Sequence, residues 1–180
     1  LGRTPTRTAL AKILYFCDWL PPDFGAVGQY SVQHARSYAD EGHDVDLLGL
    51  TSGQAYSEEI PLTRGSLRIH RMHASLYRKD ALVRRLIWTI VTDVRLVARA
   101  LPWLLSVDTV IFTGSPPFLL HLLAPLNGFL RKKLVYRISD FYPECLMAGR
   151  ARVPLPMRLF YHLTNFWRRR VTTFQALGED

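Results

Sequence analysis

Two glycines, Gly25 and Gly28, stand three residues apart in a loop that follows the first apolar segment of the chain. Because glycine has no side chain, backbone N–H groups in such a loop can approach a diphosphate at the start of the next helix. We therefore regard Gly25, Gly28 and the adjacent Gln29 as candidates for the phosphate side of a ligand site. The same spacing also fits a tight turn that only needs glycine conformations. The loop lacks the third glycine of the dinucleotide fingerprint and the Gly-Lys-Ser/Thr of a P-loop.

Acidic side chains gather in a second loop, residues 139–144, which follows the apolar segment 133–138. Asp140 and Glu144 could act as a base and an orienting group for a sugar hydroxyl, with Tyr142 between them. The alternative is that Asp140 caps the next turn and that Glu144 is solvated. If segment 133–138 is a parallel strand, this loop opens at its carboxyl end, where such sheets bind ligands.

Other common chemistries find little support in the residue types and spacings. The two cysteines, Cys17 and Cys145, form no C-x-x-C pair, so we expect reduced thiols in a cytosolic protein. The six histidines form no obvious i,i+4 pair, and we expect no metal site. The G-x-S-x-G signature of a hydrolase is absent. No apolar run reaches the roughly 18 residues of a membrane-spanning helix.

The net charge of +8 on 180 residues suits an anionic partner, although simple solubility would also account for it. Residues 80–105 have the pattern of a long helix. At ~100° per residue, Arg84, Trp88, Arg95 and Arg99 fall within about 60° of one another on its surface. Such a face suits an anionic membrane surface. The alternative is a solvated basic face with one tryptophan at its rim.

The stretch from Cys145 to Gly178 contains no acidic residue and six arginines, interleaved with aromatic residues. Arginines on phosphates and aromatic rings on bases would suit a nucleic acid. The same residues could hold a helix against anionic lipid head groups. We favour lipid over nucleic acid, because the predicted basic helix at 80–105 also suits a membrane surface and no RNA-binding motif is present. The arginines are Arg150, Arg152, Arg158, Arg168, Arg169 and Arg170.

Strand-like and helix-like segments alternate along the chain after a basic N-terminal lead, residues 1–11. This alternation predicts an α/β fold: a Rossmann-like, mostly parallel sheet flanked by helices. Residues 51–65 are polar and predict a loop, and 67–72 predict a strand near an edge. The expected strands are 12–17, 45–50, 67–72, 108–113, 133–138 and 172–177, and the expected helices are 29–41, 80–105, 118–130 and 155–170.

The order and spacing of four motifs resemble the N-terminal half of the family 4 glycosyltransferases. The loop at 139–144 (SDFYPE) is similar to the D-x-[YW]-P-E loop of bacterial surface-polysaccharide members. The other motifs are the strand 12–18 with the following PPDFGAVG at 21–28, the segment ADEGHDVDLL at 39–48, and FQALGED at 174–180.

This resemblance implies a GT-B fold, in which two Rossmann-like domains face each other across a cleft. Residues 12–180 would be the acceptor-side domain, and the C-terminal donor-binding domain, with its E-x(7)-E motif, would be absent from this chain. The implied activity is retaining hexosyl transfer from a nucleotide-sugar to a lipid-linked or glycan acceptor in polysaccharide biosynthesis, without cofactor or metal. The location would be peripheral, at the inner face of the cell membrane, and the fragment alone would be inactive.

The resemblance also assigns positions to individual residues. Gly25 and Gly28 would lie beside the donor diphosphate, and Asp140 would face the reacting sugars as the catalytic residue. Ser115, in the loop 114–117, would line the acceptor side together with Tyr142 and Glu144. Ser139 stands where many members have a histidine. The alternative function is a non-catalytic α/β module that binds nucleic acid or a membrane.

Overall fold

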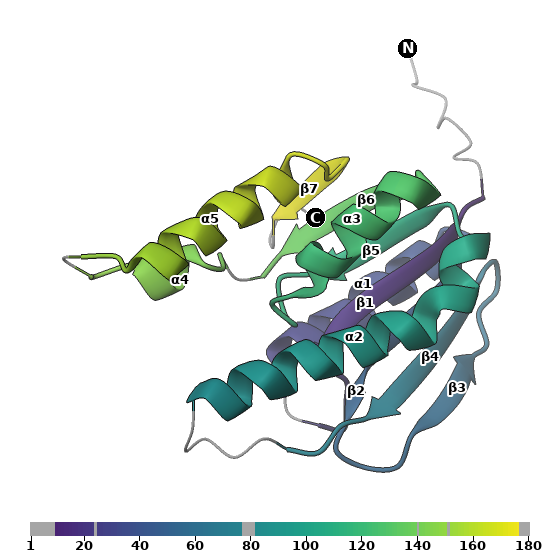
Figure 1. Cartoon of the computed structure of the whole chain (residues 1–180). Helices are drawn as coiled ribbons and strands as arrows, with labels where there is room; N and C mark the ends of the chain where they lie inside the picture. Colours follow the sequence, from purple (N-terminus) through teal and green to yellow (C-terminus); the bar gives the residue numbers. More distant parts are fainter. Residues whose placement is uncertain (1–9, 24, 77–81, 140, 151, 177–180) are drawn as a thin grey trace.

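The computed structural model describes residues 10–23, 25–76, 82–139, 141–150 and 152–176 (Figure 1). In these residues seven strands alternate with five helices. The strands are β1 (Lys12–Trp19), β2 (Asp44–Thr51), β3 (Tyr56–Ile60), β4 (Ser66–His73), β5 (Thr109–Thr113), β6 (Lys133–Ile138) and β7 (Thr173–Ala176). The helices are α1 (Ala26–Asp40), α2 (Leu82–Ser106), α3 (Leu119–Leu130), α4 (Glu144–Met147) and α5 (Leu155–Arg168).

The strands form one sheet in the order β3-β4-β2-β1-β5-β6-β7. All neighbouring pairs are parallel except β3 and β4, which are antiparallel. The order reverses at β1, because the chain moves outward through β2 and β4 and then returns through α2 to β5. Helix α1 covers one face of the sheet, and α2, α3 and α5 lie on the other (Figure 1).

Strand β1 is the centre of the core, and both of its faces are covered. Leu14 and Phe16 belong to the cluster beneath α2 and α3, whereas Ile13, Tyr15 and Cys17 belong to the cluster beneath α1. A parallel strand covered on both sides must be apolar throughout, which is why this segment has no polar alternation. Burial also raises the pKa of the Cys17 thiol, so this residue is an inert part of the core.

The sequence predictions for most elements are confirmed. Strand β6 coincides with the expected range, and β1, β2, β4, β5 and β7 differ from theirs by at most two residues at either end. Helix α1 begins at Ala26, three residues before the expected start. In α3, Leu119 and Leu123 are buried but Phe129 is 87% exposed. Most of the predicted N-terminal lead lies outside the described residues.

The prediction of a loop over residues 51–65 is wrong, because β3 lies within it. This strand is mostly exposed and polar, and it pairs along the edge of the sheet with β4. Edge strands often carry charged residues such as Glu58 and Glu59, so the usual apolar signal is missing. Strand β4, expected near an edge, is therefore the second strand in and is largely buried.

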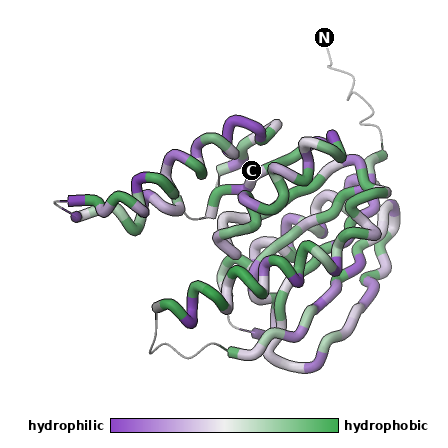
Figure 2. Tube along the Cα trace, in the orientation of Figure 1, coloured by the Kyte–Doolittle hydropathy of each residue, from purple (hydrophilic) through white to green (hydrophobic). Residues whose placement is uncertain are grey.

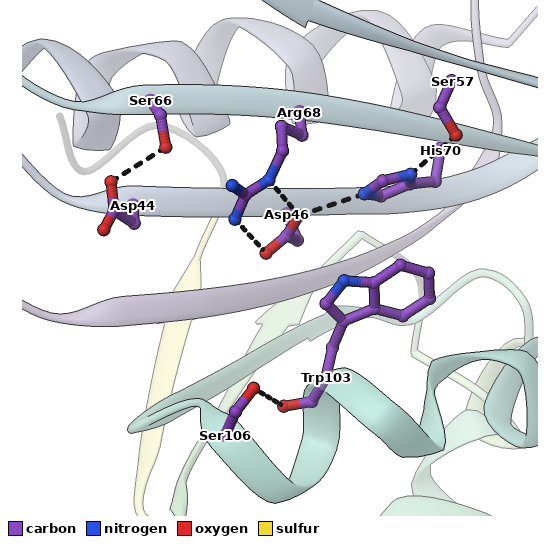
Figure 3. A network of polar contacts seen from close by, with 8 residues as sticks. All are labelled: Asp44, Asp46, Ser57, Ser66, Arg68, His70, Trp103 and Ser106. Atoms are coloured by element: carbon purple, nitrogen blue, oxygen red, sulfur yellow. Dashed lines mark hydrogen bonds and ion pairs between the residues drawn. The ribbon is translucent and has the colours of Figure 1, made fainter.

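A polar network lies on the α2 face near the amino ends of the strands (Figure 3). Asp46 on β2 accepts hydrogen bonds from Arg68 Nε at 2.7 Å and Nη2 at 2.9 Å, and its Oδ1 lies 3.0 Å from His70 Nε2. The ring of His70 also packs on Trp103 of α2, with centroids 4.7 Å apart. Burial alone would raise the pKa of Asp46, but hydrogen bonds from His70 and Arg68 outweigh it and lower this pKa to about 2. The network thus ties β2, β4 and α2 together.

Candidate functional site

The carboxyl ends of β1, β5 and β6 lie on one edge of the sheet, because these strands are parallel neighbours. The order of strands reverses between β1 and β5, and open α/β sheets bind ligands in the crevice at such a point. The loop after β1 and the loop after β6 therefore begin on the same rim, as the sequence predicts. Asp140, the predicted catalytic residue, lies in the second loop but outside the described residues.

The loop after β1 is anchored by residues of β2 and β4. Asp23 accepts hydrogen bonds from Thr51 Oγ1 at 2.7 Å and from the backbone N–H of Ser52 at 3.0 Å. Burial would raise the pKa of Asp23, but the hydrogen bonds from Ser52 and Thr51 hold it below its usual value. Arg71, which is buried, donates from Nε to the carbonyl of Pro21 at 2.9 Å. The loop is thus held in place at two points.

Gly25, which precedes α1, and Gly28, in its first turn, allow close packing of α1 against the end of β1. A Cβ on Gly28 would lie 1.8 Å from the carbonyl oxygen of Trp19, and one on Gly25 would lie 3.2 Å from the same atom. Gln29 is exposed, and its N–H makes a 3.2 Å hydrogen bond to the carbonyl of Gly25. Packing therefore accounts for Gly28. Contact of these three residues with a diphosphate stays a prediction.

A pocket of about 220 Å³ lies where the N-terminus of α1 meets the ends of β5 and β6. Neither Gly25 nor the first turn of α1 supplies a capping or acidic side chain. The N–H groups at this end of the helix therefore keep their positive partial charge toward the crevice. The pocket is lined by Ala26, Val27, Tyr30, Ser31, Thr113, Arg137 and Ser139.

Arg137 is the cationic side chain of this pocket and is only 5% exposed. Its Nη1 donates a 2.5 Å hydrogen bond to Nε2 of His34, so this ring nitrogen is an acceptor and carries no proton. The ring of His34 also contacts the ring of Tyr38, with centroids 4.7 Å apart. Ser139 Oγ is buried and has no hydrogen-bond partner among the described residues. A guanidinium, a free hydroxyl and a helix N-terminus together suit a phosphate or another anion.

The loop after β5 is held at both ends by carboxyl groups. Ser115 Oγ donates to Asp18 Oδ2 at 2.5 Å, and the N–H of Phe118 donates to Asp93 Oδ2 at 3.0 Å. Burial raises the pKa of Asp93 to about 8, and the nearby charge of Asp18 adds to this effect. The hydroxyl proton of Ser115, predicted to face the acceptor, is therefore committed to Asp18.

The predicted acceptor residues Tyr142 and Glu144 are tied to α5. Arg168 donates from Nη2 to the carbonyl of Tyr142 at 2.7 Å and to Glu144 Oε2 at 3.0 Å, and its Nη1 bonds Oε1. The hydrogen bond from Arg168 lowers the pKa of Glu144. Neither residue is among those that line the pocket. One of the six arginines that suggested a nucleic-acid or lipid surface is thus used within the fold.

The predicted membrane face of α2 divides into two parts. Arg84, Arg95 and Arg99 are exposed. Trp88 is half-buried and stacks on Trp19, with ring centroids 6.2 Å apart and an interplanar angle of 11°. The tryptophan therefore packs on the end of β1, while the arginines face outward. None of the helices described is long and apolar enough to cross a membrane. Contact of α2 with a membrane stays a prediction.

Sequence reasoning missed Arg137, Thr113 and Ser31 as pocket residues. Arg137 left a signal, because it interrupts the apolar run of a strand with neighbours on both sides. A charged residue in such a strand is rarely buried without a specific role. Thr113 and Ser31 left none, because small hydroxyl residues are common at strand ends and in helices.

No protein-family model and no curated protein matches the chain. Its fold is similar to a solved structure described as "Trehalose-6-phosphate from E. coli bound with UDP-2-fluoro glucose", with a TM-score of 0.55 and 12% sequence identity. The match covers 91% of this chain but 39% of the E. coli chain. At this identity the similarity shows the fold alone. It confirms the predicted fold class, a mostly parallel α/β sheet that matches one Rossmann-like half of a GT-B fold.

Proposed function

We propose that this chain is the acceptor-side half of a glycosyltransferase that uses a nucleotide-sugar donor. The observation that carries the proposal is the pocket beside the N-terminus of α1, where buried Arg137 lies at the carboxyl edge of the sheet. The fold supports it, because the similar E. coli structure is described as bound to UDP-2-fluoro glucose.

The pocket has the charge that this reaction needs. Transfer of a sugar breaks the bond between its anomeric carbon and a diphosphate oxygen, and negative charge builds on the departing diphosphate. The uncapped N-terminus of α1 and the guanidinium of Arg137 are fixed positive groups that stabilise such charge as it develops. In the proposal, groups of the chain itself therefore take this role, and Ser139 Oγ supplies a further hydrogen bond.

The finer parts of the proposal follow from the family resemblance. The reaction would be a retaining hexosyl transfer to a lipid-linked or glycan acceptor in polysaccharide biosynthesis at the inner face of the membrane. Asp140 would face the reacting sugars, with the loop at Tyr142 and Glu144 on the acceptor side. Because the chain spans 39% of the similar structure's length, a donor-binding half would have to complete the cleft. Residues 1–180 alone should therefore give little or no turnover. Robust sugar transfer by these residues alone would contradict the proposal that they form only one side of the cleft.

Binding of nucleotide-sugars to the chain tests the proposal directly. Saturation-transfer NMR detects weak ligands, and a panel that starts with UDP-glucose should show contact. Arg137→Gln should abolish the signal. Ser139→Ala should weaken binding by roughly five- to ten-fold, which is the value of one hydrogen bond. Ser139→Ala should also leave stability unchanged, because the buried hydroxyl has no partner to lose.

Arg68→Gln is the matched control, because Arg68 pairs with Asp46 in the network near the amino ends of the strands. It should leave nucleotide-sugar binding intact. Circular dichroism and urea unfolding would show whether each variant is folded. The proposal fails if no nucleotide-sugar or glycan contacts the chain, or if folded Arg137→Gln binds as well as the unmodified protein.

A further inference from the structure

We propose that α2 docks the chain onto an anionic lipid bilayer through a ridge of exposed aliphatic side chains flanked by arginines. The ridge consists of Val83, Ile87, Ile90 and Val94, which follow one another at steps of four, three and four residues. This spacing keeps them on one side of a helix. The inference deepens the membrane location in the proposed function and rests on it in that respect, but it does not depend on the transfer chemistry of the pocket.

Helix α2 has two apolar stripes, although a helix packed on a sheet needs one. The inner stripe contains Leu96, Ala100 and Leu104, which are buried against the core. The ridge forms the second stripe, and its four side chains are between 40% and 68% exposed. In Figure 2 α2 is mostly green, with hydrophilic segments in between. A contiguous exposed apolar surface of this kind marks an interaction site.

The charges beside the ridge identify the partner as anionic. Arg84, Arg95 and Arg99 are exposed and lie on one flank of the ridge. The single acidic residue of α2 is Asp93, which is fully buried and faces the loop after β5. The exposed surface of α2 is therefore aliphatic and cationic, without an opposing charge of its own. This combination is typical of helices that lie in the head-group region of anionic membranes.

Helix α5 repeats this composition in the same layer of helices (Figure 1). Leu155, Leu159 and Leu163 are exposed at steps of four residues, and Arg158 is exposed among them. Like the outer surface of α2, α5 contains no acidic residue. The layer of α2, α3 and α5 is thus the membrane-facing side in this proposal, and α1 lies on the opposite side of the sheet.

A lipid bilayer fits the ridge better than a nucleic acid does. Single-stranded nucleic acids bind through cationic grooves and aromatic rings on which bases stack. The ridge offers Val and Ile, which cannot stack on bases, and Trp88, the tryptophan between the ends of the ridge, is packed against Trp19. Aliphatic side chains gain free energy by entering an apolar phase, and arginines gain it from anionic head groups.

Vesicle co-sedimentation of the chain tests the docking. Vesicles would contain phosphatidylcholine alone, or two parts of it to one part of phosphatidylglycerol. We expect partition onto the anionic vesicles only, weaker at high salt. The double variant Arg95→Gln/Arg99→Gln should lower partition by about 30-fold, since each arginine contributes roughly five-fold. Ile87→Ser/Val94→Ser should lower it by about ten-fold or more, because both side chains lose their transfer into the apolar phase.

Two matched controls should leave partition unchanged. Leu10→Ser removes a leucine that is 76% exposed just before the amino end of β1. Arg36→Gln removes an exposed arginine of α1, on the opposite face of the sheet. All substituted side chains are exposed, and urea unfolding would show that the variants keep their stability.

Four outcomes would overturn the docking proposal. The first is that the chain does not bind anionic vesicles, and the second is that Ile87→Ser/Val94→Ser binds them as well as the unmodified chain does. In the third and fourth, the chain does not bind vesicles but either self-associates through the ridge or binds single-stranded RNA in a salt-sensitive way. Nucleotide-sugar binding is measured without vesicles, so a failure of docking removes only the membrane location and leaves the pocket chemistry standing. A failure of nucleotide-sugar binding leaves the docking standing.

Discussion

The hydroxyl of Ser115 donates a 2.5 Å hydrogen bond to Oδ2 of Asp18, and this bond joins the end of β1 to the loop that follows β5. The two strands lie on either side of the point where the strand order reverses. Asp93 holds the other end of the same loop through the N–H of Phe118. The loop beside the candidate site is therefore fixed by two carboxyl groups from different elements.

The variant Asp93→Asn should stabilise the protein increasingly as pH rises. The folded pKa of Asp93, about 8, lies above its usual 3.8, so the folded state keeps a proton that the unfolded chain releases. The wild-type protein therefore loses stability between pH 3.8 and 8, by at most about 1.4 kcal/mol per pH unit. Asparagine removes this dependence and keeps an oxygen that accepts from Phe118. Urea unfolding at pH 5, 6.5 and 8 would measure the free energy of unfolding of both proteins. Parallel curves of this free energy against pH would contradict the prediction.

Asp46 should make the opposite contribution in acid. Its folded pKa of about 2 lies below the usual 3.8, so its stabilisation is complete above pH 3.8 and is lost as pH falls toward 2. The shift corresponds to about 2 kcal/mol. Asp46→Asn should lower the free energy of unfolding at pH 7 and flatten the acid dependence. The exposed Asp44 on the same strand is the control: Asp44→Asn keeps an oxygen that can accept from Ser66 and should keep the acid dependence (Figure 3).

Two Gly→Ala substitutions should have effects of opposite sign. At Gly28 the new methyl group would lie 1.8 Å from the carbonyl oxygen of Trp19, so α1 must move away from β1. We expect a loss of about 1–3 kcal/mol in the free energy of unfolding, as for an overpacked core. At Gly128 in α3, the added carbon meets no atom within 4 Å apart from the helix's own nearby backbone, and alanine should stabilise the helix by about 0.5–1 kcal/mol. Equal effects in thermal unfolding would show that contact with Trp19 does not constrain α1.

The sequence was sufficient for the central strands of the sheet because they are apolar on both faces. Segments such as β1 and β6 are short apolar runs that end at proline or a polar loop, so their bounds could be predicted closely. Strand β3 could not, because an exposed edge strand of the composition YSEEI is held by pairing with β4 rather than by its own apolar residues.

Helix α2 shows a different limit. Periodicity places Val83, Ile87 and Val94 on one stripe, but a helix with apolar residues on two sides does not reveal which side faces the sheet. Only the packing shows that this stripe is exposed and that Trp88 turns toward Trp19.

The candidate site was the least predictable part of the molecule. Its rim follows from parallel strands, so the positions of the loops were correct. The pocket itself forms where Arg137 and Ser139 lie beside α1, although they are about a hundred residues away from it in the sequence. No local sequence pattern predicts such a contact.

The loops after β1, β5 and β6 share one rim, while the register of these strands is set by buried residues below it. Replacing the residues of one loop therefore leaves the alignment of the strands untouched. Proteins with this fold can therefore acquire a new ligand preference through a few substitutions in these loops, while the sheet still folds in the same way.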